Sequence, residues 1–215
     1  MIENPHAVIR KFQKRDREEV RRISCATALV GKPSSIFFAG DELFADCLTL
    51  YFTDYEPESC FVAESRGKVV GYIIGAKDAS RIGRKDFLFR ILLKTIASAA
   101  LLKPKNLLFI WHCLMSFLKR EFSEPGFSQD YPATLHINVH EDSRGLKIGA
   151  GLIGAYLEYL KEEGVRGVHF ATMSERASGF FSQQGFELLY KGKRSYFRYI
   201  LHHDLPLYIY GKRLS

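Results

Sequence analysis

Residues 140 to 150, "HEDSRGLKIGA", place an arginine and two glycines directly after a strand-like run and directly before an apolar helical pattern. A strand that feeds such a turn leaves backbone N–H groups unpaired at the positive end of the helix dipole. The amides from Arg144 to Ala150 could therefore hold a phosphate or pyrophosphate. Gly145 and Gly149 would allow close approach, and Arg144 would add charged donors. A junction that binds nothing has the same pattern, so both interpretations stay open at this point.

Two elements must position this turn. The run "ATLHINVH" alternates strictly and predicts a strand over 133–140, with Leu135, Ile137 and Val139 on one face and His136, Asn138 and His140 on the other. After the turn, Ile148, Leu152, Tyr156 and Leu160 recur at helical spacing, and Gly164 is a typical helix end. The sequence therefore predicts a strand, a glycine-containing turn and a helix of about 15 residues.

The remaining elements are read from periodicity and turn residues. In chain order we expect a strand and helix over 7–30, a loop at "GKPSSIFF", a second helix over 40–55, a β-hairpin over 59–78 and two helical pieces over 87–122. A strand over 167–173, a short helix at "SERASGFFSQQGF" (174–186) and a closing strand pair formed by "FELLYKGK" and "SYFRYILH" follow. We find no internal repeat and no low-complexity linker. One domain over 1–215 is expected from the length.

Composition narrows the class of protein without choosing a ligand. The net charge of +7 permits attraction to any anionic partner. Four widely spaced cysteines and two adjacent histidines predict neither a disulfide framework nor a metal site. The N-terminal residues lack the apolar stretch of a signal peptide, so we expect a cytoplasmic protein with free thiols.

Residues 87–122 are the least polar part of the chain. They are too short and too often interrupted, by Lys94, Lys103, Lys105 and Pro104, to span a membrane. Three interpretations remain open: a helix pair that is buried or faces a partner such as a second copy, a contact with a membrane surface, and a lid over an apolar substrate.

Two motifs resemble the GNAT superfamily of N-acetyltransferases, which transfer an acetyl group from acetyl-coenzyme A to an amine. Their first signature is Arg or Gln, two residues, Gly, one residue, and Gly or Ala, and "RGLKIG" over 144–149 matches it with one departure. The second is Asn, two residues, Ala, two residues, Phe-Tyr, three residues, and Gly-Phe; this chain has Ser174, Ala177, "FF" at 180–181 and "GF" at 185–186. The order of elements is similar over most of the chain.

The resemblance implies a GNAT-type α/β (α+β) fold: a mixed central sheet of six to seven strands flanked by helices. Residues 80–131 would then form a helical insertion between strands 3 and 4. The pantetheine arm of acetyl-coenzyme A is expected along the backbone of Ile137, Asn138 and Val139. The pyrophosphate is expected on the turn and helix start, at Arg144, Gly145, Leu146, Lys147, Ile148, Gly149 and Ala150.

Three residues depart from the family pattern. Lys147 replaces a glycine, and Ser174 replaces an asparagine that contacts the pantetheine arm. Phe181 replaces a tyrosine whose hydroxyl protonates the departing thiolate in the family, so Tyr190 or Tyr196 would have to donate through water. That loss is tolerable, because general acid catalysis contributes about 10²- to 10⁴-fold.

The amine must lose a proton, and His140 and Glu141 are our candidates for the base, with Glu56 and Glu58 as alternatives. The resemblance thus implies direct acetyl transfer from acetyl-coenzyme A to an amine of a small molecule or peptide. The acceptor would be set by residues 31–44 and 80–131, whose content favours an apolar or aromatic amine. Two alternatives remain: a non-catalytic acyl-coenzyme A-binding module of the same fold, and a basic surface-binding protein that uses 87–122. We expect no nucleic-acid partner.

Overall fold

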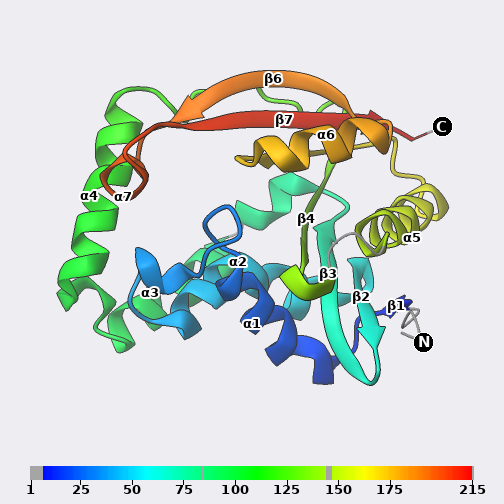
Figure 1. Ribbon diagram of the computed structural model, residues 1–215, viewed down its shortest axis with the longest axis horizontal. Coiled ribbons are helices and arrows are strands. Elements are labelled where there is room, and N and C mark those ends of the chain that lie inside the picture. Colours follow the sequence, from blue (N-terminus) through cyan, green and yellow to red (C-terminus); the bar gives the residue numbers. More distant parts are fainter. Residues whose placement is uncertain (1–6, 84, 144–146, 215) are drawn as a thin grey trace.

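The computed structural model describes residues 7–83, 85–143 and 147–214 (Figure 1). The strands are β1 (Val8–Lys11), β2 (Cys60–Ser65), β3 (Lys68–Ala76), β4 (Ala133–Val139), β5 (Gly167–Thr172), β6 (Glu187–Arg194) and β7 (Leu205–Arg213). The α-helices are α1 (Arg17–Ala26), α2 (Asp41–Tyr55), α3 (Lys85–Ala97), α4 (Pro104–Leu118), α5 (Ile148–Glu162), α6 (Glu175–Gln183) and α7 (Arg198–Leu201).

The seven strands form one mixed sheet in the order β1-β2-β3-β4-β5-β7-β6. Neighbouring strands are antiparallel except β4 and β5, which run parallel. Parallel neighbours need a crossover, and α5 provides it. The mixed sheet with flanking helices and the helical insertion between the third and fourth strands are confirmed.

Helices cover both faces of the sheet. On one face, α5 packs Leu152, Tyr156 and Leu160 against the sheet, in the core that also holds Phe181 of α6. On the other face, Val20 and Ile23 of α1 pack with alternate residues of β2 and β3. Because side chains alternate along each strand, the same strands supply both cores.

A third cluster of apolar side chains joins parts of the chain that are far apart in sequence. Phe37, which precedes α2, lies 5.0 Å from Phe109 of α4 and 4.9 Å from Phe197, just before α7, measured between ring centroids. Leu29 and Leu205 complete its buried part. The insertion is therefore fixed to the domain through α4.

The expected closing strand pair is wrong in its second member. "SYFRYILH" contains α7 instead of a strand, and β6 pairs with β7. Phe197 and Leu201, four residues apart, both pack in the third cluster, which is helical spacing. His202 then ends the helix in the left-handed conformation, with φ 62°.

The two predicted helical pieces of the insertion are α3 and α4, and Pro104 stands at the first position of α4, where a missing N–H costs nothing. One interpretation of residues 87–122, that the two helices are buried within the chain, is wrong. Most large apolar side chains of α3 and α4 face solvent.

Candidate functional site

The parallel strands β4 and β5 separate soon after they meet. Their ladder contains two registered pairs, Ala133 with Val168 and Thr134 with His169. On its other side β4 stays paired with β3 up to Val139. The strands therefore diverge along the stretch that contains Ile137, Asn138 and Val139, which opens the sheet on the β5 side of β4.

A buried tyrosine of α5 marks the point of separation. The Oη of Tyr156 donates a 2.7 Å hydrogen bond to the carbonyl oxygen of Thr134. A Cβ added at Gly75 of β3 would lie 2.1 Å from that Oη and 2.7 Å from the same carbonyl oxygen. Gly75 is thus required for Tyr156 to reach across the sheet.

Helix α5 begins shortly after the diverging stretch of β4 in the sequence. Lys147 is its N-cap residue, is exposed, and has φ 58°. Among the described residues, the Lys147 side chain makes no capping hydrogen bond at this helix start, where the first N–H groups have no partner within the helix. Arg144, Gly145 and Leu146 lie outside the described residues.

Ile148, Gly149 and Ala150 form the first turn of α5. The Ile148 side chain is buried in the core, so only its backbone groups could contact a ligand at this helix start. A Cβ at Gly149 would meet the Phe180 ring at 3.1 Å, so this glycine lets α6 approach α5 closely.

Ser174 and Phe181, the two residues that depart from the second family motif, both have structural roles in α6. Ser174 is the N-cap of α6, and its Oγ accepts a 3.3 Å hydrogen bond from the N–H of Ala177. The Phe181 ring is buried, with its centroid 4.4 Å from that of Phe170 and 6.0 Å from that of Tyr210. Phe181 thus packs α6 on the sheet as part of an aromatic cluster.

Two of the three catalytic candidates lie together and the third lies elsewhere. His140 follows β4, where its N–H donates to the carbonyl oxygen of Val70 at 2.8 Å, and Glu141 is exposed in the next turn. Tyr190 lies on the edge strand β6, with β7 between it and β5. His140 and Glu141 therefore share one end of β4, and Tyr190 stands apart from them.

Glu56, an alternative base, is engaged elsewhere. Its buried carboxylate accepts hydrogen bonds from Ser59 Oγ at 2.8 Å and from the N–H of Lys77 at 2.7 Å. These contacts tie the start of β2 to the end of β3. Glu58 is half-exposed and lies 3.9 Å from Lys77 Nζ.

A polar network on β4 was missed by sequence reasoning. On the α1 face of the sheet, Asn138 Nδ2 lies 2.9 Å from Tyr72 Oη and 3.3 Å from His136 Nε2. Because an amide nitrogen only donates, His136 Nε2 must be unprotonated. Burial lowers the pKa of His136 to about 4 and raises that of Tyr72 to about 12. The alternation of "TLHINVH" places His136 and Asn138 on one face but does not show that Tyr72 joins them.

Segments 31–44 and 80–131 meet beside the end of β5. The third cluster contains Phe37, Phe44 and Phe109 from these segments. Next to them, Tyr196 Oη lies 3.4 Å from Sδ of Met173, which directly follows β5. Burial raises the pKa of Tyr196 to about 12, so its hydroxyl stays protonated at neutral pH.

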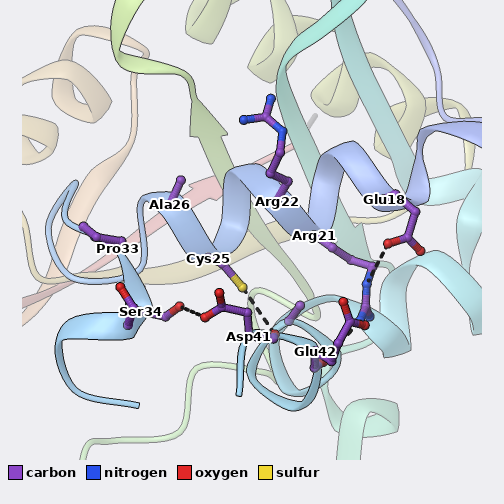
Figure 2. Close-up of a pocket in the computed structure, with 11 residues that line it drawn as sticks. Glu18, Arg21, Arg22, Cys25, Ala26, Pro33, Ser34, Asp41 and Glu42 are labelled. Atoms are coloured by element: carbon purple, nitrogen blue, oxygen red, sulfur yellow. Dashed lines mark hydrogen bonds and ion pairs between the residues drawn. The ribbon is translucent and has the colours of Figure 1, made fainter. Parts of the chain in front are cut away.

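A cavity of about 360 Å³ lies between α1 and the segment that leads into α2 (Figure 2). Its walls come from α1 and residues 33–45, and no residue of β4 or β5 lines it. Ser34 Oγ donates to Asp41 at 2.9 Å, and Arg21 pairs with Glu42 across it. The cavity is thus separate from the opening between β4 and β5.

Within residues 7–83, 85–143 and 147–214, no group of three acidic, histidine or cysteine side chains is placed to hold a metal ion. The four cysteines are free thiols. No helix in the same ranges is long and apolar enough to cross a membrane.

Comparisons with known proteins show the family and the fold. The model of the acetyltransferase (GNAT) family matches residues 30–186. SsHAT has a similar solved structure, with 24% identity, a TM-score of 0.69, and coverage of 98% of this chain and 100% of that one. The polyamine N-acetyltransferase of Drosophila melanogaster follows with 16% identity, a TM-score of 0.59, and coverage of 97% and 100%.

The ribosomal-protein-alanine N-acetyltransferase of Brucella melitensis is also similar, with 18% identity, a TM-score of 0.56, and coverage of 96% and 99%. At these identities the likeness establishes the fold. A search of curated proteins found no match.

Proposed function

Because the chain belongs to the acetyltransferase (GNAT) family, we propose that it transfers an acetyl group from acetyl-coenzyme A directly to an amine of a small molecule or peptide. The observation that carries this proposal is the divergence of β4 from β5 after Thr134 and His169. An extended pantetheine arm can lie along a strand whose neighbour has turned away, much as an added strand would.

The cofactor would be held mainly by backbone groups. Ile137, Asn138 and Val139 would contact the pantetheine arm, and the turn with the first residues of α5 would hold the pyrophosphate. Lys147 adds an exposed ammonium at this helix start without removing its backbone N–H. Its charge favours an anionic ligand there.

His140 or Glu141 would accept the amine proton, directly or through one water. Both follow β4 at the end of the diverging stretch. Acetyl-coenzyme A supplies the thioester, and the departing thiol has an ordinary pKa of about 8.5, so the thiolate leaves without an obligatory acid. Tyr196 suits the role of donor through water better than Tyr190, because it lies beside Met173 at the end of β5.

The acceptor is expected to be an apolar or aromatic amine. Segments 31–44 and 80–131 meet near Met173 in a cluster of aromatic rings. We would test an aromatic amine, agmatine, a longer polyamine and an N-terminal alanine peptide. Thiol release with the aromatic amine at a higher kcat/KM than with the others supports this assignment.

The second candidate is a non-catalytic acyl-coenzyme A-binding module. It is favoured by Phe181, which has no hydroxyl and is buried, and by Ser174, whose Oγ is engaged in capping α6. The two candidates differ in turnover and share cofactor binding.

The deciding experiment combines thiol-release kinetics with the variants Arg144→Glu, His140→Gln and Glu141→Gln. We expect Arg144→Glu to raise KM for acetyl-coenzyme A. One of the other two should slow turnover by about 10²- to 10⁴-fold and remove the rise of rate with pH. No turnover of any acceptor despite tight binding of acetyl-coenzyme A would favour the module.

A further inference from the structure

Helix α3 presents its apolar side to solvent. Leu88, Phe89, Leu92, Leu93 and Ile96 form one stripe of the helix, and each of these side chains is between 49% and 65% exposed. On the opposite side, the ammonium of Lys94 donates to the buried carboxylate of Asp46. Ile91 packs against the domain, so α3 has apolar side chains on both sides, unlike the usual surface helix, whose outer side is polar.

Helix α4 packs Phe109 against the domain, but most of its large apolar side chains lie on the outer side. Its inner side carries Asn106, which is fully buried; Asn106 Oδ1 accepts from the N–H of Ala39 at 2.6 Å and Nδ2 donates to the carbonyl oxygen of Ala39 at 3.0 Å. Ser116, also fully buried, lies further along that side. The outer side carries Leu107, Leu108, Trp111, Leu114, Phe117 and Leu118, which are between 46% and 65% exposed.

The turn between α3 and α4 also carries exposed apolar side chains. Leu101 and Leu102 of the turn Ala100–Leu102 are 49% and 80% exposed. Figure 1 shows α3 and α4 at the end of the molecule opposite α5 and both chain ends. We call the exposed apolar side chains of residues 88–118 the outer face. It lies away from the start of the cofactor helix.

The charges that accompany the outer face have a single sign. From Phe87 to Arg120 the sequence contains no Asp or Glu, whereas it contains Arg90, Lys94, Lys103, Lys105, Lys119 and Arg120. Lys105 lies at the start of α4, and Lys119 and Arg120 directly follow its end; all three are exposed. An apolar helix face with cations at its ends is complementary to an anionic bilayer surface.

We propose that the outer face docks on the surface of an anionic lipid bilayer. Apolar side chains would enter the boundary between headgroups and acyl chains, while Lys119 and Arg120 contact anionic headgroups; the Lys105 ammonium donates to the carbonyl oxygen of Ser35 at 2.8 Å. A second copy fits this surface less well, because two such faces would bring cations together with no acidic partner from residues 87–120. Docking requires no bound acetyl-coenzyme A and is independent of the proposed transfer.

Trp111, the only tryptophan of the chain, lies on the outer face and is 55% exposed, so its fluorescence reports docking directly. The full chain would be mixed with vesicles of phosphatidylcholine alone and of phosphatidylcholine with phosphatidylglycerol. We expect a blue shift and quenching by brominated lipids with the anionic vesicles, together with co-sedimentation. An unchanged spectrum and no co-sedimentation would overturn the proposal.

Matched variants separate docking from general stickiness. Leu92→Glu with Leu114→Glu places charges on the outer face and should weaken co-sedimentation by about tenfold or more. Leu188→Glu changes a side chain of similar exposure, 51%, on β6 and should leave it unchanged. Lys119→Gln with Arg120→Gln should weaken binding about fivefold for each cation removed. Equal binding by all variants would contradict the assignment.

The alternative occupant has its own readout. If the outer face joins two copies, the blue shift of Trp111 will appear without vesicles, rise with protein concentration, and coincide with a dimer in sedimentation equilibrium. That outcome would overturn the membrane proposal. Quenching of the parent protein by brominated lipids decides the question even where a double variant folds poorly.

Discussion

Thr134 and His169 form the last registered pair between the parallel strands β4 and β5. The other neighbours in the sheet stay paired over longer stretches, including β3 with β4 up to Val139. The divergence therefore belongs to one strand pair, the one joined by α5. It gives an extended cofactor a strand edge and a helix N-terminus within one segment of the chain.

Tyr156 is expected to support this divergence. In Tyr156→Phe, the carbonyl oxygen of Thr134 loses a buried hydrogen bond, which should lower the free energy of unfolding by about 1–2 kcal/mol. Urea denaturation measures the change, and acetyl-coenzyme A binding should weaken in parallel. Tyr159→Phe on the same helix removes a longer contact, 3.3 Å from Ser59 Oγ, and should cost less. Equal losses for the two variants would show that Tyr156 has no special role.

Phe181→Tyr tests whether the family's hydroxyl can be restored. The Phe181 ring is buried among Phe170, Phe186 and Tyr210. A hydroxyl there enters apolar surroundings, so we expect a loss of about 1–2 kcal/mol in unfolding free energy and no faster turnover. Turnover that is faster by about 10²-fold or more would instead show that the hydroxyl reaches the leaving thiolate.

His136 makes stability depend on pH. Its pKa is about 4 in the folded protein and about 6.5 when unfolded, so the unfolded chain binds the extra proton between these values. Stability is fully present above pH 6.5 and is lost as pH falls toward 4, by an amount on the order of 2–3 kcal/mol. Urea denaturation across this window should show the loss, and His136→Gln should flatten it. The same slope in the variant would assign the effect to other groups.

Asp46 is expected to fix α3 to the domain. Burial alone would raise the pKa of its carboxyl, but hydrogen bonds from Lys94 and Arg21 outweigh burial and hold the pKa below the ordinary value. Asp46→Asn removes the carboxylate that Lys94 and Arg21 share, although Arg21 keeps Glu42, and should cost about 1.5–3 kcal/mol. Hydrogen exchange should show α3 losing protection first. Glu18→Gln, which changes an exposed carboxylate beside Arg21, should cost less than about 0.5 kcal/mol.

Local patterns predicted the elements that carry the candidate site. The alternation of "TLHINVH" and the stripe Ile148, Leu152, Tyr156 and Leu160 correspond to β4 and α5. The hairpin across Arg66 and Gly67 is also found, with both residues at positive φ. These features are set by neighbours in sequence, which is why periodicity was sufficient.

Features that depend on distant contacts were not predictable in this way. No local pattern of residues encodes the divergence of β5 from β4 after Thr134 and His169. "SYFRYILH" contains strand-favouring residues, yet Phe197 and Leu201 are drawn into a cluster with Phe37 and Phe109. Lys94 pairs with the buried carboxylate of Asp46, which lies far from it in the sequence. The side of α3 that faces water could therefore not be predicted from the helical spacing of its apolar residues.

The most direct test of the account is a calorimetric titration with acetyl-coenzyme A and with coenzyme A. The parent protein should bind with micromolar affinity, about −8 kcal/mol. Lys147→Glu, at the start of α5, should weaken binding by about tenfold or more, whereas Lys161→Glu, the same charge change in the last turn of that helix, should leave it unchanged. No binding by the parent protein, or equal losses in the two variants, would contradict a cofactor site at the N-terminus of α5.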